Sequence, residues 1–236
     1  MTIRRILWAV GALCALLAVL FALFLLSKSR SFQVFGKLVT RVETPQKRIA
    51  LTIDDGPTER TKEILSALDE LGVPATFFLC GGAMADRPED ARAIASAGHE
   101  IGNHTYSHQR MVLVSYGFCK DEVEKTNRLI REAGYAGTIY FRPPYFKRLF
   151  VLPWYLKEAG ITTVLCDVEP ETELGSDAPA GDLADLMVRQ AKPGSILLMH
   201  AMYNENALDA IRLAVPQLKA QGYEFVTTDQ LIKESA

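Results

Sequence analysis

The chain has 236 residues, of which 49% are hydrophobic and 23% charged, a length and composition typical of one globular domain with an additional segment. Residues 1–30 contain four basic side chains and no acidic one, so the rest of the chain, with 22 basic and 28 acidic residues, is acidic. This balance excludes the basic surface expected of a nucleic-acid-binding protein, and we expect no nucleic-acid partner.

An apolar run without charged residues begins the chain. Residues 6–26 would form a helix about 30 Å long, which matches the thickness of a bilayer core. A secretory signal has a shorter apolar region followed by a small-residue cleavage site, whereas this run ends in Leu-Phe-Leu-Leu. We therefore predict a basic segment at 1–5, an uncleaved transmembrane anchor at 6–26 and a tether at 27–46. A cleaved signal peptide is the alternative.

The orientation of this anchor does not follow from charge, because basic residues flank both of its ends: Arg4 and Arg5 before it, and Lys28, Arg30, Lys37 and Arg41 after it. A long domain after the anchor can be translocated regardless of such charges. The function inferred below favours a single-pass protein of the cytoplasmic membrane whose domain faces the periplasm or exterior.

From residue 47 onward, short apolar runs alternate with longer amphipathic ones. Seven runs are predicted to be strands: 49–53, 75–79, 99–102, 138–141, 162–166, 195–199 and 224–226. Apolar residues spaced by three and four predict helices between most of them, and glycines end these helices. Strands that alternate with helices favour a parallel α/β fold, and seven such units predict a closed or nearly closed barrel. A doubly wound open sheet is the alternative.

Polar residues follow several of these strands, at the ends where active sites of parallel α/β folds lie. They are Asp54-Asp55-Gly56-Pro57, His104 with His108, Arg142-Pro143-Pro144-Tyr145, Asp167 with Glu169, and His200. Each group alone also fits a structural role, such as a turn, a rigid loop or a buried histidine. Their coincidence at matching strand ends favours a single active site.

A divalent metal accounts for most of these residues. Two histidines four residues apart can present both imidazoles to one ion, and one carboxylate completes three ligands, with positions left for water and substrate. Side chains of adjacent aspartates diverge, so one binds the metal and the other takes the proton of the water. Arg142 is suited to holding that second carboxylate ionised, His200 to protonating the leaving amine, and the Tyr145 N–H to stabilising the oxyanion. The sequence contains no CxxC motif, so we do not expect a zinc site formed by cysteines.

Five motifs resemble, in order, those of the polysaccharide deacetylases, which are carbohydrate esterase family 4 or NodB-homology domains. They are TIDDGP (52–57), HTYSH (104–108), RPPY (142–145), a variant DVEP (167–170) and LLMH (197–200). The resemblance implies that residues 47–236 form a catalytic domain with a distorted (β/α) barrel, here with about seven parallel strands.

The resemblance also implies roles for individual residues. Asp54 would be the general base, oriented by Arg142, and His200 would be the general acid. Asp55, His104 and His108 would bind a divalent metal, usually zinc. Tyr145 would supply the oxyanion donor, and Pro144 and Tyr145 would contact the substrate.

The chain departs from the family pattern in three places. Phe146 stands where the family has glycine, Cys166 replaces a tryptophan, and Thr172-Glu173 replace an Asp-Trp pair that orients the catalytic histidine. We expect Asp167 or Glu169 to take over this orienting role.

The leading hypothesis is hydrolysis of N-acetyl groups on N-acetylglucosamine-containing glycans of the cell envelope, chitooligosaccharide-like or peptidoglycan-like. A second hypothesis keeps the chemistry but acts on a lipid-linked sugar as a deformylase or deacetylase. A third is an inactive glycan-binding protein, which the altered fourth motif favours.

Overall fold

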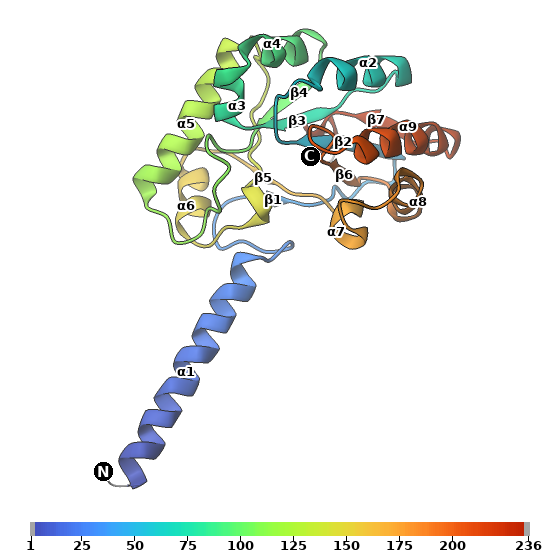
Figure 1. The fold of residues 1–236 in the computed structure, drawn as a ribbon. Coiled ribbons are helices and arrows are strands. Elements are labelled where there is room, and N and C mark those ends of the chain that lie inside the picture. The colour runs from blue at the N-terminus through green and yellow to red at the C-terminus, as the bar shows by residue number, and fades with distance from the viewer. Residues whose placement is uncertain (1–2, 234–236) are drawn as a thin grey trace.

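A parallel α/β domain with one protruding N-terminal helix makes up residues 3–233, the part of the chain that the computed structural model describes (Figure 1). The strands are β1 (Leu38–Val39), β2 (Arg48–Asp54), β3 (Thr76–Leu79), β4 (Glu100–Asn103), β5 (Thr163–Val164), β6 (Ile196–Met199) and β7 (Glu224–Val226). The helices are α1 (Ile3–Ser27), α2 (Thr61–Leu71), α3 (Gly81–Asp86), α4 (Pro88–Ser96), α5 (Tyr116–Glu132), α6 (Val151–Glu158), α7 (Pro170–Leu174), α8 (Ala180–Gln190), α9 (Glu205–Ala220) and α10 (Thr228–Lys233).

The main sheet has the strand order β4-β3-β2-β6, and β7 pairs with the first half of β2. All of these pairs are parallel. Asp54 is paired with Phe78, and Leu79 with Asn103, so the carboxyl ends of β2, β3 and β4 lie at one edge. This register brings the polar residues that follow the strands together, as expected from the sequence.

Strands form at six of the seven predicted places, whereas residues 138–141 contribute only isolated parallel bridges. Phe141 bridges Asn103 on one side and Thr163 on the other. A longer pairing is prevented because Pro143 and Pro144 follow at once and have no N–H to donate. β1 is a strand that the sequence did not predict.

Both faces of the main sheet are apolar, which explains why its strands appear as continuous hydrophobic runs. Leu51, Phe77 and Leu197 belong to one core cluster, together with residues of α2, α8 and α9. Their neighbours Phe78 and Leu198 point to the opposite face and belong to a second cluster. The alternation of side chains along a strand therefore fills two cores.

The expected tether at 27–46 is instead packed on the domain. β1 pairs in parallel with β5, the Val42 N–H donates to the Gly194 carbonyl at 2.9 Å, and Val39 and Val42 are buried in the second core cluster. The prediction was wrong because only a few apolar residues in this segment make the contacts, too few to form a periodic pattern.

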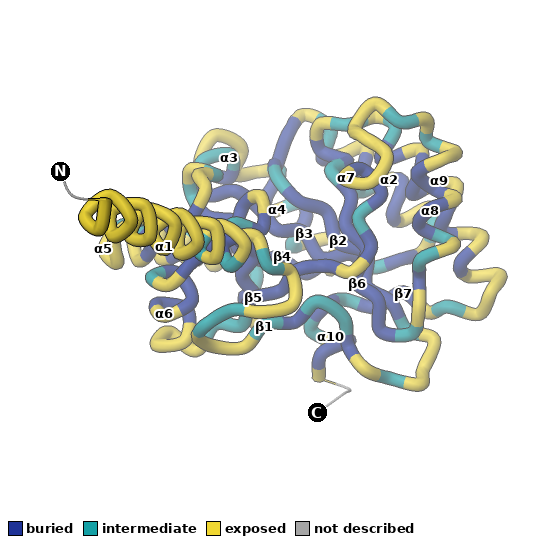
Figure 2. The backbone as a smooth tube through the Cα atoms, turned by 90° about the horizontal axis from the view of Figure 1, so that it is seen from below, coloured by how far each residue is buried: buried dark blue, intermediate teal, exposed yellow. Residues whose placement is uncertain are grey.

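The expected anchor corresponds to α1, which is slightly longer than the predicted 6–26. Its length and apolar composition suffice to cross a bilayer, a property that signal sequences share. Figure 2 shows α1 exposed along its length, in contrast to the buried interior of the domain. Cys80, Cys119 and Cys166 are buried and free, whereas Cys14 on α1 is exposed.

Candidate active site at the strand ends

Residues from six separate segments line one pocket of about 530 Å³ at the carboxyl ends of the strands. Seven of the predicted site residues line it: Asp54, Asp55, His104, His108, Tyr145, Glu169 and His200. Arg142 lies behind the pocket wall and is fully buried. The structure thus brings together the residues that the sequence grouped only by their position after strands.

Asp55, His104 and His108 form a cluster with the donor set of a metal site. Their ligand atoms lie within 4.8 Å of one another. Asp55 Oδ1 is 3.2 Å from His108 Nε2 and 3.7 Å from His104 Nε2. In a tetrahedral zinc site with bonds of about 2.0–2.2 Å, neighbouring ligand atoms are about 3.3–3.6 Å apart. The three side chains therefore fit a small divalent cation.

Hydrogen bonding and burial prepare the two histidines for this role. His104 Nδ1 is 2.7 Å from the Arg142 carbonyl oxygen, which can only accept, so Nδ1 carries the proton and Nε2 presents its lone pair to the cluster. Burial, and next the charge of His104, lower the pKa of His108, which favours the neutral, metal-binding form. Burial and the Asp55 charge raise the pKa of the Cys80 thiol, so this neighbour stays protonated.

A tight turn, not a helix, presents the two histidines. Thr105 and His108 have left-handed backbone conformations, with φ of 67° and 55°. Asn103 Oδ1 accepts from the Thr105 N–H, and Thr105 Oγ1 accepts from the His108 N–H. These bonds hold a turn that is unfavourable for residues other than glycine.

Glu122 of α5 supports the same turn from behind. One of its carboxylate oxygens accepts the N–H groups of Tyr106 and Ser107, at 3.0 and 2.8 Å, and the Ser107 hydroxyl at 3.0 Å. A carboxylate that accepts several bonds from one loop fixes its shape. No sequence pattern pointed to Glu122, because it lies in an ordinary amphipathic helix 14 residues after His108.

Asp54 and Arg142 form a buried pair beside the metal-ligand cluster. Arg142 Nη1 is 2.6 Å from Asp54 Oδ1, and the other donors of Arg142 bind Thr52 Oγ1 and the carbonyls of Val164 and Leu165. The guanidinium also stacks on Phe78, 4.0 Å from the ring centroid. Asp54 Oδ2 remains directed toward His104 Nε2, at 3.8 Å, so this carboxylate lies at the edge of the metal-ligand cluster.

His200 is oriented by Glu171, and not by Asp167 or Glu169 as expected. Glu171 Oε2 is 3.0 Å from His200 Nδ1 and accepts the His200 N–H at 2.7 Å. Asp167 instead accepts from Ser195 Oγ and the Ile196 N–H, and Glu169 pairs with Arg30. Glu171 follows Pro170 by one residue, at the start of α7, and this turn of the chain carries its carboxylate back to His200.

The pair with Glu171 changes the protonation of His200. Burial alone would lower the pKa of His200, but the hydrogen bond to Glu171 and the charges of Asp54 and Glu171 outweigh it and raise the pKa to about 9. His200 is therefore protonated at neutral pH and can donate a proton from the side of the pocket that holds Glu171.

Tyr145 lies over the metal-ligand cluster in a left-handed conformation, with φ of 55°. Its ring contacts the His108 ring at a tilt of 52°, with centroids 4.9 Å apart, and 53% of the residue is exposed. Pro144 before it is buried. The turn of residues 144–146 places Tyr145 and Phe146 in the lining of the pocket.

The family model described as polysaccharide deacetylase matches residues 41–164, more than half of the chain. A peptidoglycan-N-acetylglucosamine deacetylase of Bacillus cereus is 34% identical over 192 residues, 79% of this chain and 69% of that protein. The chain belongs to the polysaccharide deacetylase family.

Solved structures agree with this membership of the polysaccharide deacetylase family. PdaA of Bacillus subtilis, a family 4 carbohydrate esterase, aligns with a TM-score of 0.76 and 28% identity over 85% of this chain and 86% of that one. A family 4 pseudoenzyme from Bacillus anthracis aligns with a TM-score of 0.76 and 27% identity over 84% of this chain and 70% of that one. The fold alone therefore does not distinguish an active polysaccharide deacetylase from an inactive one.

The three departures from the polysaccharide deacetylase pattern lie around one side chain, Arg30. The Arg30 guanidinium is 4.6 Å from the centroid of the Phe146 ring and donates to Cys166 Sγ at 3.9 Å. Thr172 lines the same pocket. A segment that precedes the catalytic motifs thus fills the space beside the altered residues.

Proposed function

We propose that this polysaccharide deacetylase removes N-acetyl groups from N-acetylglucosamine-containing glycans of the cell envelope, with a divalent metal, best fitted by zinc, in the site of Asp55, His104 and His108. The observation that carries the proposal is the arrangement of three parts around one pocket. A cluster of three metal-ligand atoms lies beside the buried Asp54–Arg142 pair, and the protonated His200 contributes to the same pocket. The names of the bacterial relatives support the glycan.

The metal would be bound through Asp55 Oδ1 and the Nε2 atoms of His104 and His108. When bound, it polarises the acetyl carbonyl and lowers the pKa of a water molecule toward about 7. Asp54, which Arg142 holds in place, would take the proton of the attacking water as general base. The adjacent residues Asp54 and Asp55 would thus have different roles, proton transfer for Asp54 and metal binding for Asp55.

His200 and Tyr145 would act on the leaving amine and on the oxyanion. Protonated His200, held by Glu171, donates its proton to the leaving amine nitrogen of the sugar. Among the hydrogen bonds of residues 3–233, none uses the Tyr145 N–H, so this donor is available to the oxyanion of the transition state. The Tyr145 side chain would contact the substrate, whereas Pro144, which was expected to do so, is buried and does not line the pocket.

The proposed architecture is a distorted barrel on a membrane anchor. Bridges at Phe141 join β4 to β5, and a parallel bridge between Val168 and Leu197 joins the chain after β5 to β6, which would close the ring. α1 would anchor the protein in the cytoplasmic membrane, with the domain in the periplasm or exterior, where its glycans are found. The catalytic unit would then extend from the packed segment after α1 to the C-terminus.

Acetate release from N-acetylglucosamine oligosaccharides and peptidoglycan fragments tests the proposal directly. We expect turnover by the full chain, loss on treatment with a chelator and recovery with zinc, and bound metal by elemental analysis. N-formylated analogues test the deformylase alternative. A chain that binds these glycans but releases no acetate with any divalent metal would support the inactive glycan-binding alternative instead.

A further inference from the structure

The segment that follows α1 enters the catalytic pocket. Arg30 lies three residues after Ser27, the last residue of α1, and lines the pocket together with Asp54 and His200. Its Nη2 atom is 2.5 Å from Glu169 Oε2, and its guanidinium lies over the ring of Phe146. The end of the candidate membrane helix and the reaction centre are therefore joined by a very short piece of chain.

A buried arginine, Arg148, fixes this junction. Its side chain donates to the carbonyl oxygens of Phe32 and Phe146, at 3.1 and 3.0 Å, and to Gln33 Oε1 at 3.1 Å. Its backbone N–H donates to the carbonyl of Ser27 at 3.1 Å. One residue thus connects the end of α1, the following segment and the loop that carries Tyr145, so the pocket and α1 are held together.

The short connection limits the distance between pocket and bilayer. Three residues span at most about 11 Å, since a fully extended chain advances about 3.3–3.6 Å per residue. The headgroup layer on each side of a bilayer core is about 5–8 Å thick. If α1 spans the membrane, as proposed above, Arg30 and the pocket it lines lie close to the headgroups.

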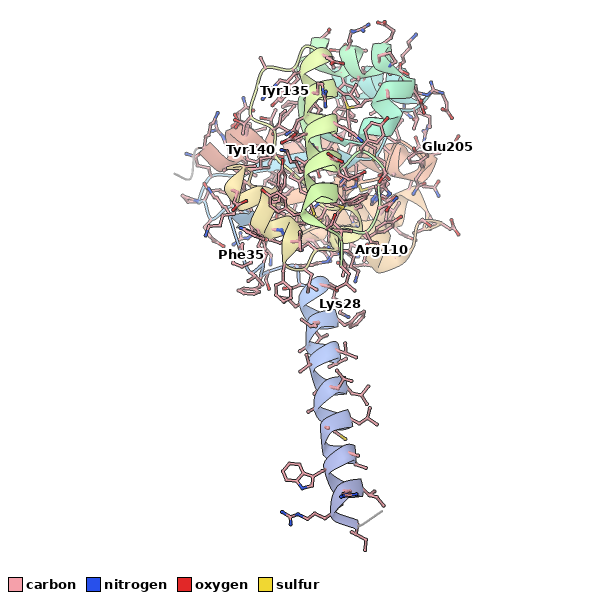
Figure 3. All side chains as sticks on the ribbon, turned by 90° about the vertical axis from the view of Figure 1, so that its left-hand side faces the viewer. Lys28, Phe35, Arg110, Tyr135, Tyr140 and Glu205 are labelled. Carbon is pink, nitrogen blue, oxygen red and sulfur yellow. The ribbon has the colours of Figure 1, made fainter. Side chains whose placement is uncertain are left out.

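The surface around this junction has the character of a membrane-facing surface. Lys28 and Lys147 both lie over the Phe24 ring of α1, at 4.8 and 5.4 Å from its centroid. Burial and the positive charges of Lys28 and Arg110 lower the pKa of Lys147, which places three cations near one another. Figure 3 shows Lys28 and Arg110 at the end of the domain that α1 joins, whereas Tyr135 lies at the opposite end.

Exposed apolar side chains lie beside these cations. Phe32 and Leu113 are 56% and 88% exposed. A bridge between Met111 and Arg148 brings the loop of Leu113 to the Arg148 junction, whose side chain holds Phe32. Cations next to exposed apolar side chains are typical of surfaces that lie at a bilayer interface and contact phosphate.

We propose that the substrate is an N-acetylated glycan attached to a membrane lipid through phosphate, with the sugar in the pocket and the phosphate near Lys28, Lys147 and Arg110. This inference rests on the proposed deacetylation and names the class of glycan that it uses. A site held at headgroup level reaches glycans at the membrane surface far more often than glycans free in solution.

Two substrates with the same N-acetylated tetrasaccharide test the inference, one free and one linked to a lipid diphosphate. The full chain is placed in vesicles of phosphatidylcholine, a lipid whose headgroup has no net charge. The substrate is then the one lipid in the vesicle with a net negative charge. We expect kcat/KM for the lipid-linked form to exceed that for the free form by at least about tenfold, in line with a raised effective concentration. Equal values would overturn the inference.

An insertion at the end of α1 separates the pocket from the bilayer and leaves the pocket residues unchanged. Ten Gly/Ser residues between Leu26 and Ser27 leave the Ser27 carbonyl bonded to the Arg148 N–H and add a flexible spacer with a mean end-to-end distance of about 17 Å between α1 and the domain. We expect this variant to keep its turnover of the free tetrasaccharide and to lose most of its preference for the lipid-linked form. An unchanged preference would overturn the inference, whereas acetate release from neither substrate by the unaltered chain would overturn the proposed function itself.

The cations are tested by Lys28→Gln and Lys147→Gln. Each is expected to lower kcat/KM for the lipid-linked form by about fivefold, the effect of one lysine near an anionic surface, and to leave the free form unchanged. Lys120→Gln on α5, where Lys120 pairs with Glu124 at 4.0 Å, is the matched control. An equal loss in the control would show that total charge, and not this cluster, acts on the substrate.

Discussion

Two buried arginines six residues apart, Arg142 and Arg148, use the same side chain for different purposes. Both are at most 1% exposed. In each guanidinium, the three nitrogen atoms Nε, Nη1 and Nη2 all donate hydrogen bonds. Arg142 has a carboxylate partner, Asp54, at 2.6 Å. Within residues 3–233, the hydrogen-bond partners of the Arg148 side chain are only carbonyl and amide oxygens, and burial lowers the pKa of Arg148 to about 10.

The different partners suit the two arginines to different roles, Arg142 in the active site and Arg148 in holding two segments together. The charge of Arg142 is matched by a second buried charge, so the pair fixes the carboxylate that we propose as the general base. The Arg148 guanidinium instead donates to carbonyl and amide oxygens of two segments far apart in sequence, at residues 32–33 and at 146. These bonds join the segment after α1 to the loop of the pocket. One buried arginine therefore lies in the candidate active site, and the other connects this site to the segment that follows α1.

The largest effect is expected from the partner of Arg142. Asp54→Asn should lower kcat about 10³-fold, because a general base contributes about 10²–10⁴-fold, and should leave the bound metal in place. Acetate release and elemental analysis measure the two quantities. His108→Ala is the contrasting variant and should lose the metal; the opposite outcome would show that Asp54 and Asp55 have exchanged roles.

Arg142→Met should lower the free energy of unfolding by about 3–5 kcal/mol, because it leaves the buried Asp54 carboxylate without its partner. Urea denaturation of the full chain in detergent measures this change. Adding Asp54→Asn to the same chain should recover part of the loss. If the double variant is as unstable as the sum of the two single variants, the pair is not coupled as described.

Arg148→Met should have a smaller effect on stability, about 1–3 kcal/mol, because it leaves buried oxygens without donors but orphans no opposite charge. The same denaturation experiment applies. A loss as large as that of Arg142→Met would contradict the distinction between the two arginines. Protease cleavage between α1 and β1 should also become faster in this variant, since the segment of Phe32 loses its attachment.

The smallest change is expected in the pH dependence. His200 must be protonated to act as an acid, so activity should fall as the pH rises, and Glu171→Gln should move this fall to lower pH by lowering the pKa of His200. NMR titration of the metal-free chain should give about 9 for His200, and a value nearer about 6.5 in the variant. A pKa that Glu171→Gln does not change would remove Glu171 from this role.

The same pair links stability to pH. The pKa of His200 is higher in the folded chain than in an unfolded one, so the stabilisation by Glu171 is complete below about pH 6.5 and is lost as the pH rises through about 9. Thermal unfolding of the metal-free chain at pH 6 and pH 10 measures this loss, which Glu171→Gln should reduce. His99, buried beside Phe77 and without a carboxylate contact of this kind, offers a matched histidine for substitution as a control.

The sequence determined the parallel α/β class, the family and the grouping of Asp54, Asp55, His104, His108, Arg142 and His200. It could do so because parallel strands end at one edge of a sheet, so residues that follow different strands must meet there. Only the tertiary structure decided that Glu171 holds His200, that Arg148 joins α1 to the catalytic loop and that Arg30 enters the pocket. These contacts connect residues 29 to 136 positions apart, and which side chains meet over such distances depends on packing that no local pattern encodes.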